Sequence, residues 1–408
     1  MSDSPAHDLS HGPLTGIRVI EFGQLLAGPY VASLLGDFGA DVVKVEAPPN
    51  GDPMREWGRH RHNGHTLWWP ILSRNKRSVS LNLRTEEGQR IALELCAEAD
   101  VVLENFKPGT MEKWGIGPEQ VHERNPGCIY ARVSGYGQTG RYRDRAGFAS
   151  GGEAMAGLRY INGYPGQAPP RCGISLGDTL AAQSCFQGIL LALYARDARG
   201  ATGQVVDAAI LDACFSMLES TVPEYDKCGV VREPSGTVLA KIAPSNVYLS
   251  SDGKWVVIAA NHDTLFRRLC AVMGRPELAD DPRFSTHAAR GERMEELDAI
   301  IGEWAAQHTA KELDEIVNAA SVVCAPVYTI ADVFDDPHFR ERGLLVEMQD
   351  PELGELTAPG VVPKLSGTPG GIRHPGTWTV GGHNEQVLGE RLGLGADEIA
   401  RLQQDGVL

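Results

Sequence analysis

The stretch IRVIEFGQLLAGPYVASLLGDFGADVVKVE, residues 17–46, predicts the fold of this chain. Residues 17–22 alternate between apolar and polar side chains as a strand does, and residues 41–46 form a second strand-like segment. Between them lie a loop (23–29) and an apolar helix (30–38), which Gly39 ends. A strand, a helix and a second strand in this order indicate two parallel strands joined by a right-handed crossover.

The same alternation continues beyond this unit. We expect further strands at 78–83, 101–103, 129–133 and 204–209, and helices at 86–97 and 178–196. The helix at 178–196 is apolar almost all round, which predicts a buried helix. Strands that alternate with helices predict an α/β domain with an open, doubly wound (Rossmann-like) sheet.

A chain of 408 residues is longer than a single hydrophobic core usually supports, so two packed units are expected. Residues 13–218 form the N-terminal part of the large α/β domain, and the loosely patterned residues 219–243 form a linker. A smaller α+β domain follows at 244–335 and opens with a hairpin whose turn is Asp252-Gly253. Residues 336–408 are interpreted as a linker and a return to the large domain.

Composition excludes several classes of protein. The formal net charge of −15 argues against a nucleic-acid partner. The polar residues 1–16 contain no apolar core of a secretory signal, and no apolar run approaches the ~20 residues of a membrane span. Eight scattered cysteines without paired spacing favour a reducing, cytoplasmic location, and no HExxH or similar pattern indicates a metal site.

The common nucleotide and hydrolase motifs are also missing from the sequence. A Rossmann dinucleotide site needs GxGxxG directly after the first strand, and the turn here reads GQLLAGP, residues 23–29. Neither a Walker A sequence nor GxSxG occurs. The sequence therefore argues against assigning this chain to the dehydrogenases, the P-loop NTPases or the α/β-hydrolases.

Six segments recur together in one known family. These are LLAGPY (25–30), GDFGADVVKVE (36–46), RNKRS (74–78), ENFKPG (104–109), SGYGQTG (134–140) and GD (177–178). From about Leu14 to the C-terminus, the sequence resembles the class III CoA-transferase family, which includes formyl-CoA transferase, carnitine CoA-transferase and the α-methylacyl-CoA racemases. The resemblance implies transfer of CoA from an acyl-CoA to a free carboxylic acid, with no cofactor beyond CoA as co-substrate. It also implies an interlocked homodimer.

Asp178 matches the catalytic aspartate of that family. It lies at the start of the expected buried helix, where backbone N–H groups and the helix dipole favour an anion. An ionised carboxylate can attack a thioester carbonyl and form a mixed anhydride. The alternative reading of the same position is an Asp that caps the helix.

Several segments match family positions that contact CoA. Arg84 and Lys113 suit the phosphates of CoA, and Phe106 suits packing on the pantetheine arm. Lys76 and Arg77 are further candidates for phosphate contact, but surface charge at a strand end is the favoured reading. The full set of expected CoA contacts is Leu26, Ala27, Leu81, Asn82, Leu83, Arg84, Asn105, Phe106, Lys107, Lys113, Arg145, Ala146, Gly147 and Phe148.

Departures from the family pattern narrow the activity. Leu26 replaces the glutamine of formyl-CoA transferase, and Ala47 replaces an arginine of that enzyme. Two readings of Gln24 stay open: a partial substitute for the missing glutamine, or a loop side chain that faces water. The His-Asp pair of the racemases is replaced by Phe148 and Ala149, which accept no proton, so acyl-CoA α-epimerisation is the disfavoured alternative.

The sequence also bears on the acceptor acid, on Glu153 and on the active-site lid. Resemblance to glutarate-type enzymes favours a dicarboxylate such as succinate, with Arg171 as its carboxylate partner. Glu153 is expected to be a surface group or a helix cap. No glycine run marks the active-site lid. A catalytically silent CoA-binding dimer remains the alternative from another class.

Overall fold

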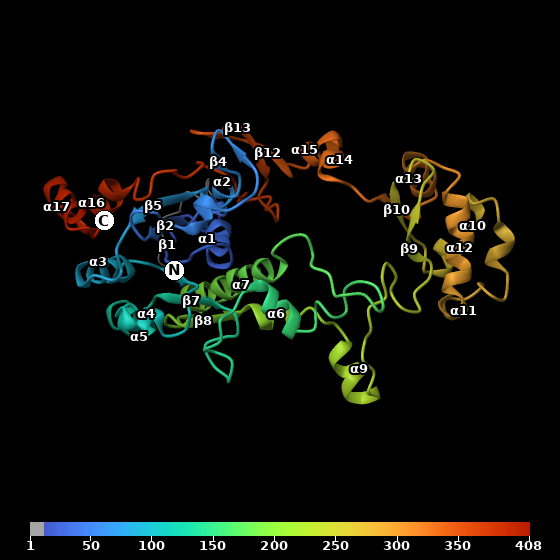
Figure 1. The fold of residues 1–408 in the computed structure, drawn as a ribbon, viewed down its shortest axis with the longest axis horizontal. Coiled ribbons are helices and arrows are strands. Elements are labelled where there is room, and N and C mark those ends of the chain that lie inside the picture. Colours follow the sequence, from blue (N-terminus) through green and yellow to red (C-terminus); the bar gives the residue numbers. More distant parts are fainter. Residues whose placement is uncertain (1–11) are drawn as a thin grey trace. The chain divides into compact units, whose positions relative to one another are not determined.

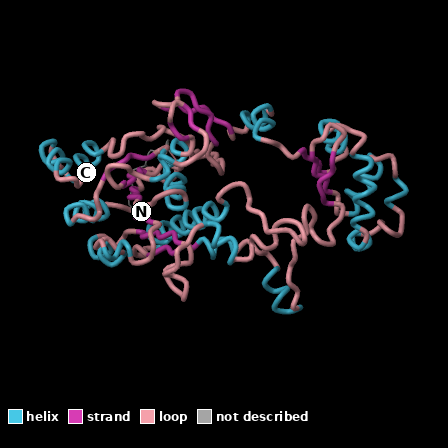
Figure 2. The backbone as a smooth tube through the Cα atoms, viewed as in Figure 1, coloured by secondary structure: helices cyan, strands magenta, loops and turns pink. Residues whose placement is uncertain are grey.

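The computed structural model describes residues 12–408, which divide into two compact units (Figures 1 and 2). The first unit comprises residues 12–158, 172–220 and 338–408, and the second comprises residues 159–171 and 221–337. Arg171 is exposed and belongs to the second unit. Most of the polar leader on which the expectation about secretion rests lies outside the described residues.

A six-stranded parallel sheet forms the centre of the first unit. Its spatial order is β5-β2-β1-β6-β7-β8, so sequence order reverses direction between β1 and β6. This is the doubly wound arrangement, and the predicted α/β class with a parallel sheet is confirmed. The strands are β1 (Arg18–Glu21), β2 (Asp41–Glu46), β5 (Lys76–Ser80), β6 (Val101–Glu104), β7 (Ile129–Ser134) and β8 (Val205–Ala209).

Helices cover both faces of this sheet because neighbouring strand residues point to opposite faces. Val19 packs in one core with residues of α1, α7 and α8. Ile20 packs in the other with residues of α3, α5, α16 and α17. The helices are α1 (Ala27–Asp37), α3 (Glu86–Ala97), α4 (Thr110–Lys113), α5 (Pro118–Arg124), α6 (Ala149–Met155), α7 (Leu176–Arg199), α8 (Ile210–Phe215), α16 (Asn384–Leu392) and α17 (Ala396–Gln404).

Helix α1 begins at Ala27, earlier than the expected Tyr30, because Pro29 falls in its first turn, where proline is tolerated. Helix α7 differs more. Its Ala181, Cys185 and Ile189 are buried, whereas Leu191 is 71% and Tyr194 57% exposed. The expectation of a helix buried all round is wrong for a single chain, because only one of its faces packs on the sheet.

Strand β5 begins at Lys76, and this lysine is not a surface charge. Its side chain is 2% exposed, its Nζ lies 2.9 Å from Glu21 Oε2, and it donates a 2.7 Å hydrogen bond to the Pro29 carbonyl. Burial lowers the pKa of Lys76 to about 8. Arg77, by contrast, pairs with Asp41 and Glu390 near the surface. These contacts place Lys76 in the interior of the first unit.

The C-terminal residues complete the first unit. Ser78 N donates to His383 Nδ1 at 3.1 Å, and Ser80 N donates to Asn384 Oδ1 at 2.9 Å, so side chains of this segment cover the free edge of β5. Helices α16 and α17, at the red end of the colour bar, thus belong with the blue strands β1 and β2 (Figure 1). The remaining elements of this unit are η1 (Pro53–Glu56), β3 (Arg61–His62), β4 (His65–Thr66), α2 (Trp69–Ser73), β12 (Leu345–Asp350) and β13 (Gly354–Pro359).

The second unit has an antiparallel sheet of order β11-β10-β9, with β9 (Ser245–Leu249), β10 (Trp255–Ala259) and β11 (Val323–Pro326). The expected turn at Asp252-Gly253 joins β9 to β10, with Gly253 at a φ of +76°. Helix α9 (Thr221–Cys228) lies within the expected linker. The other helices are α10 (Asp263–Val272), η2 (Pro276–Ala279), α11 (His287–Glu292), α12 (Met294–Ala305), α13 (Ala310–Ala319), α14 (Ile330–Asp335) and α15 (Pro337–Glu341), the last of which crosses the boundary between the units.

Candidate active site

A pocket of about 190 Å³ lies at the carboxyl ends of the strands, where the strand order reverses. Ligands of doubly wound sheets bind at this place, because the loops after two neighbouring strands diverge there. We call it the Asp178 pocket. Its lining residues are Gln24, Leu25, Leu26, Ala27, Met54, Trp57, Trp68, Asn105, Phe106, Val133, Ser134, Gly135, Gly147, Phe148, Ser175, Asp178 and Ile210.

A second pocket of about 430 Å³, the Arg84 pocket, adjoins the first. Gln24 and Phe106 line both, so the two pockets are neighbours. The lining residues of the Arg84 pocket are Phe22, Gln24, Val45, Glu46, Ala47, Pro48, Leu81, Asn82, Leu83, Arg84, Phe106 and Trp114. Two neighbouring pockets, one of them with an arginine in its lining, suit a long cofactor that ends in phosphates.

Asp178 is partly buried and lies in the first turn of α7, two residues after the first helical residue, Leu176. Ser175, not Asp178, occupies the capping position, and its side chain makes no capping hydrogen bond. Asp178 therefore lines a pocket and lies at the N-terminal, positive end of the dipole of a 24-residue helix. That position favours the ionised, nucleophilic form.

Glu153 of α6 is buried, contrary to the expectation of a surface group. Its Oε1 accepts a 3.0 Å hydrogen bond from Gly177 N, directly before Asp178, and so satisfies an N–H group of the first turn of α7. The pKa of the Cys214 thiol is raised to about 11, first by burial and then by the charges of Glu153 and Asp178. The charges of Glu153 and Asp178 therefore both act on the Cys214 thiol, which means that the two carboxylates lie near each other.

The loop after β1 forms the wall that the two pockets share. Gln24 N donates to Asn105 Oδ1 at 2.8 Å, and Asn105 Nδ2 donates to the Gln24 carbonyl at 2.9 Å. The next residue, Leu25, has a φ of 63°, in the left-handed region that residues with a β-carbon rarely adopt. Helix α1 begins two residues later, and no side chain caps its first turn.

The structure brings most of the expected CoA contacts together. Leu26, Ala27, Asn105, Phe106, Gly147 and Phe148 line the Asp178 pocket, and Leu81, Asn82, Leu83 and Arg84 line the other. Lys107, Lys113, Arg145 and Ala146 are exposed and are absent from both linings. The Arg145 guanidinium instead lies 3.7 Å from the centre of the Tyr142 ring.

Sequence reasoning missed an aromatic rim. Trp57 and Trp68 line the Asp178 pocket together with Phe148, and all three side chains are exposed. Met54 and Ile210 complete the apolar lining. Residues 54–68 have no helical or strand periodicity, so their only signal is two tryptophans on either side of a short polar hairpin.

The charges in the two pockets are unequally distributed. Among the described residues that line the Asp178 pocket, none is Lys, Arg or His, so positive potential there comes from the first turns of α1 and α7. Arg84 supplies a cation in the adjoining pocket. Across residues 12–408, no group of three or more His, Cys, Asp or Glu side chains is arranged to hold a metal ion. No described helix is long and apolar enough to cross a membrane.

The sequence and the structure of this chain are similar to those of known proteins. Residues 14–384 match the family model described as CoA-transferase family III. Succinyl-CoA--D-citramalate CoA-transferase of Chloroflexus aurantiacus is 50% identical over 396 residues, which cover 97% of this chain and 98% of the relative. The alpha subunit of succinyl-CoA--L-malate CoA-transferase from Chloroflexus aurantiacus is 41% identical over 399 residues, with 97% and 92% covered. A CAIB/BAIF family protein from Brucella suis superposes with a TM-score of 0.82 at 33% identity, with 93% of this chain and 100% of that chain covered.

Proposed function

The chain belongs to CoA-transferase family III and is a CoA-transferase, and from this premise we propose that it moves CoA from succinyl-CoA to a short dicarboxylic acid through covalent intermediates on Asp178. One observation carries the proposal. Asp178 lines a pocket that shares Gln24 and Phe106 with a neighbouring pocket, which Leu81–Arg84 line. A thioester at the junction has its carbonyl on the Asp178 side and its CoA moiety on the Arg84 side.

The reaction proceeds by four displacements at carbonyl carbon. An Asp178 oxygen attacks the succinyl thioester, the C–S bond breaks, and CoA thiolate leaves behind a mixed anhydride. The thiolate attacks the Asp178 carbonyl carbon of that anhydride, which releases succinate and forms an aspartyl-CoA thioester. The acceptor carboxylate then attacks this thioester to form a second anhydride and thiolate. Finally, the thiolate attacks the acceptor's carbonyl carbon, which yields the new acyl-CoA and free Asp178.

No proton is gained or lost in these steps, because carboxylates and thiolate serve as nucleophiles and leaving groups throughout. The site therefore needs stabilisation of oxyanions rather than a general acid or base. The Asp178 pocket fits this requirement, since its described lining carries no histidine or lysine and adjoins the first turns of α1 and α7. Phe148, at the position of the racemase base, offers no group to remove an α-proton.

CoA is assigned to the larger pocket. Arg84 is the proposed partner of its phosphates, and Phe106, whose ring lies 5.2 Å from that of Trp114 in an edge-to-face arrangement, is the proposed neighbour of the pantetheine arm. Lys107, Lys113 and Arg145 are proposed as further phosphate contacts, although they are absent from the pocket linings.

The substrate class rests on the relatives. Two of them are named for D-citramalate and L-malate, which are short hydroxylated dicarboxylates, with succinyl-CoA as the donor. We assign the same class of acceptor to this chain. The resemblance of its sequence to glutarate-type enzymes also favours a dicarboxylate.

A homodimer is part of the proposal. Leu191, Tyr194, Phe215 and Met217 on or beside α7 and α8 are exposed in the single chain, and apolar surface of this extent favours a partner. Light scattering should give twice the chain mass of 44.0 kDa at all practical dilutions, and an active monomer would contradict the dimer. The six buried thiols among eight free cysteines suit a reducing compartment such as the cytoplasm.

The experiment that tests the mechanism uses succinyl-CoA with citramalate, malate and glutarate, and mass spectrometry of the CoA products. Hydroxylamine should trap Asp178 as a hydroxamate during turnover. Asp178→Ala should lose roughly a thousandfold or more in kcat, about 4 kcal/mol of transition-state stabilisation. Near-normal turnover by Asp178→Ala would overturn the covalent mechanism, and transfer only to monocarboxylates would overturn the substrate class.

A further inference from the structure

The backbone of residues 23–25 is held at every step by side chains from other parts of the chain. The Gly23 carbonyl accepts a 2.8 Å hydrogen bond from Lys44 Nζ, and Leu25 N donates to Asp52 Oδ1 at 3.0 Å. Asn105 binds both backbone groups of the intervening Gln24. Leu25, with its φ of 63°, sits in the middle of these contacts. A conformation that a β-carbon disfavours persists only where its surroundings enforce it.

The side chains of Lys44 and Asp52 are held in place by buried ion pairs. Lys44 Nζ lies 2.8 Å from Asp52 Oδ2 and 2.8 Å from Glu21 Oε1, and all three side chains are almost completely buried. Although burial lowers it, the carboxylates of Asp52 and Glu21 raise the pKa of Lys44 above its usual range. The ammonium therefore stays charged, and a charged group in this interior has few alternatives to its present partners.

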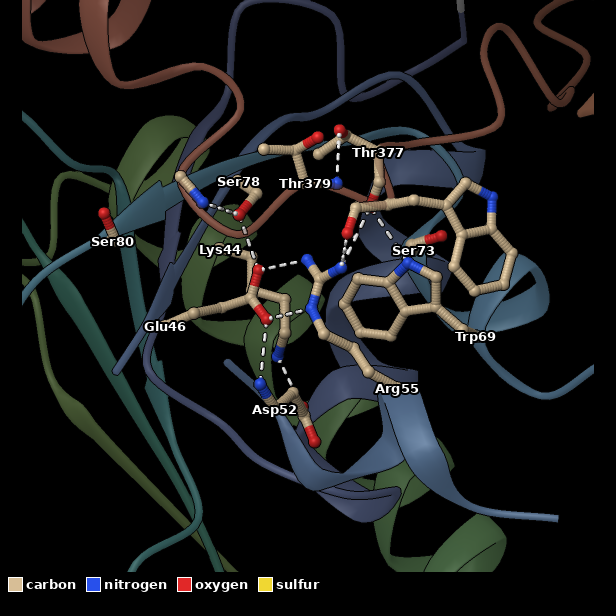
Figure 3. Close-up of polar contacts among 12 residues, drawn as sticks. Lys44, Glu46, Asp52, Arg55, Trp69, Ser73, Ser78, Ser80, Thr377 and Thr379 are labelled. Atoms are coloured by element: carbon tan, nitrogen blue, oxygen red, sulfur yellow. Dashed lines mark hydrogen bonds and ion pairs between the residues drawn. The ribbon is translucent and has the colours of Figure 1, made fainter. Parts of the chain in front are cut away.

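A second layer of contacts supports Asp52, as Figure 3 shows. Asp52 N donates to Glu46 Oε1 at 2.9 Å, and Glu46 receives the Arg55 guanidinium at 2.9 and 2.7 Å. Arg55 in turn donates to the Trp378 carbonyl at 2.5 Å and stacks 3.9 Å from the centre of the Trp69 ring. The carboxylate that reaches Leu25 is thus anchored to strand β2 and to the C-terminal segment.

We propose that Lys44 and Asp52 are positioning residues of the CoA-transfer site, which hold Leu25 in its left-handed conformation and thereby fix Gln24, Leu26 and Ala27 on the pocket wall. The proposal rests on the Asp178 pocket being the place of transfer. Without the two contacts, residue 25 relaxes to a negative φ, and the chain direction changes between the end of β1 and the start of α1. Gln24, which lines both pockets, moves with it.

The test compares glycine and alanine at position 25 in two backgrounds. Both substitutions remove the Leu25 side chain, but only glycine adopts a positive φ without a steric penalty. In the wild-type background, Leu25→Gly and Leu25→Ala should have kcat values within about threefold of each other, because the contacts of Lys44 and Asp52 hold the backbone of residues 23–25 in both variants. Asp52→Ala should lower kcat at least tenfold. In the Asp52→Ala background, Leu25→Gly should exceed Leu25→Ala by at least fivefold.

An equal Gly-to-Ala ratio in the two backgrounds would overturn the proposal, because a general loss of stability acts alike on both variants. Asp52→Asn keeps an Oδ1 acceptor for Leu25 N but loses the ion pair with Lys44 and turns an amide donor toward the buried ammonium, so it should also lower kcat at least tenfold. If Asp52→Ala fails to fold by circular dichroism, Leu25→Gly and Leu25→Ala are compared in the Asp52→Asn background, and a Gly-to-Ala ratio equal to that in the wild-type background overturns the proposal.

Asp405→Ala is the control for loss of an aspartate. Asp405 forms an exposed ion pair with Arg401, 3.0 Å apart, so its removal should leave kcat unchanged. Asp178→Ala is measured in parallel. Activity in that variant would refute the location of the reaction, whereas an inactive Asp178→Ala with an unchanged Gly-to-Ala ratio would refute only the role of Asp52.

Discussion

The side-chain amide of Asn105 joins two loops of the sheet by binding both backbone groups of Gln24, at 2.8 and 2.9 Å. Gln24 follows β1, and Asn105 follows β6, the neighbouring strand across the reversal of strand order. A β-carbon on Gly28 would lie 3.0 Å from Asn105 Cγ, so the first turn of α1 also approaches this amide closely. One side chain therefore fixes the pocket wall relative to the sheet.

Asn105→Ala should remove both hydrogen bonds, destabilise the protein by about 1–3 kcal/mol and lower kcat by at least tenfold. The physical reason is that the wall at Gln24 loses its attachment to β6. Asn125→Ala is the matched control, because Asn125 Nδ2 also spans two loops by donating to the Ala99 carbonyl, at 2.8 Å, away from the site. Urea unfolding and steady-state kinetics of both variants should show similar losses of stability and a loss of kcat in Asn105→Ala alone.

Arg84→Ala should weaken CoA binding about 5–150-fold, which corresponds to 1–3 kcal/mol for a lost charge-assisted hydrogen bond. KM should rise with little change in kcat, since the phosphates are held alike in ground and transition states. Calorimetric titration of free CoA measures the effect directly. Arg124→Ala, which removes an exposed arginine outside both linings, should bind CoA as the wild type does. Unchanged affinity in Arg84→Ala would mean that CoA does not occupy this pocket.

Glu153 orients the first turn of α7 through Gly177 N. Glu153→Ala should slow both turnover and hydroxylamine trapping of Asp178 by at least tenfold, whereas Glu153→Gln, which keeps an oxygen acceptor, should restore most of the rate. Glu86→Ala removes an exposed carboxylate from the first turn of α3 and should change neither rate. If Glu153→Gln is as slow as Glu153→Ala, the charge of Glu153 matters rather than its hydrogen bond.

The pH dependence of stability should report on Glu104, beneath the loop that carries Asn105. Burial raises the pKa of Glu104 from 4.5 to about 7, against the opposing effect of Arg132, whose Nε lies 2.7 Å from Glu104 Oε1. Between these two pH values the folded state holds a proton that the unfolded state has lost. The contribution of Glu104 to the free energy of unfolding therefore falls as pH rises through this range and stays low above it.

Arg132 Nε donates to Glu104 Oε1 and Phe106 N donates to Glu104 Oε2, each at 2.7 Å. Glu104→Gln removes the titration and keeps one oxygen, which accepts from only one of these two donors, so the variant has a loss of stability that does not depend on pH. The free energy of unfolding of the variant minus that of the wild type should rise from about pH 5 to about pH 8. Urea unfolding at both pH values measures this difference. A difference between the two proteins that is independent of pH would contradict the raised pKa.

Local patterns in the sequence were sufficient to predict the sheet. Residues 17–46 specify two strands and their crossover helix, and repetition of this unit leaves few topologies for a parallel sheet. The reversal of strand order then places the pocket beside Asn105. Asp178 and the CoA segments required a resemblance between sequences, because an aspartate in the first turn of a helix is usually only a favourable charge.

Contacts between distant residues were not predictable in this way. Lys76 appeared to be a surface charge because periodicity alone does not show that Glu21, on a strand two positions away in the sheet, faces it. The aromatic rim of Trp57 and Trp68 depends on an irregular loop that folds back over the site. Leu25 carries no sequence signal for a positive φ, since that conformation is imposed by Asp52 and Lys44.

The bond from Arg55 to the Trp378 carbonyl spans 323 residues, and it constrains the order of events on the ribosome. At about 5–20 residues per second, roughly 16–65 s pass between synthesis of the two partners. During that interval, residues 221–337 emerge and have every residue of the second unit available, while the earlier-made sheet still lacks its C-terminal cover. Synthesis of the second unit, which ends at residue 337, is therefore finished before that of the first unit, which ends at residue 408. During this interval the edge of β5 lacks its cover from His383 and Asn384, and an open strand edge favours pairing with other chains, so we expect premature association of nascent chains to begin there.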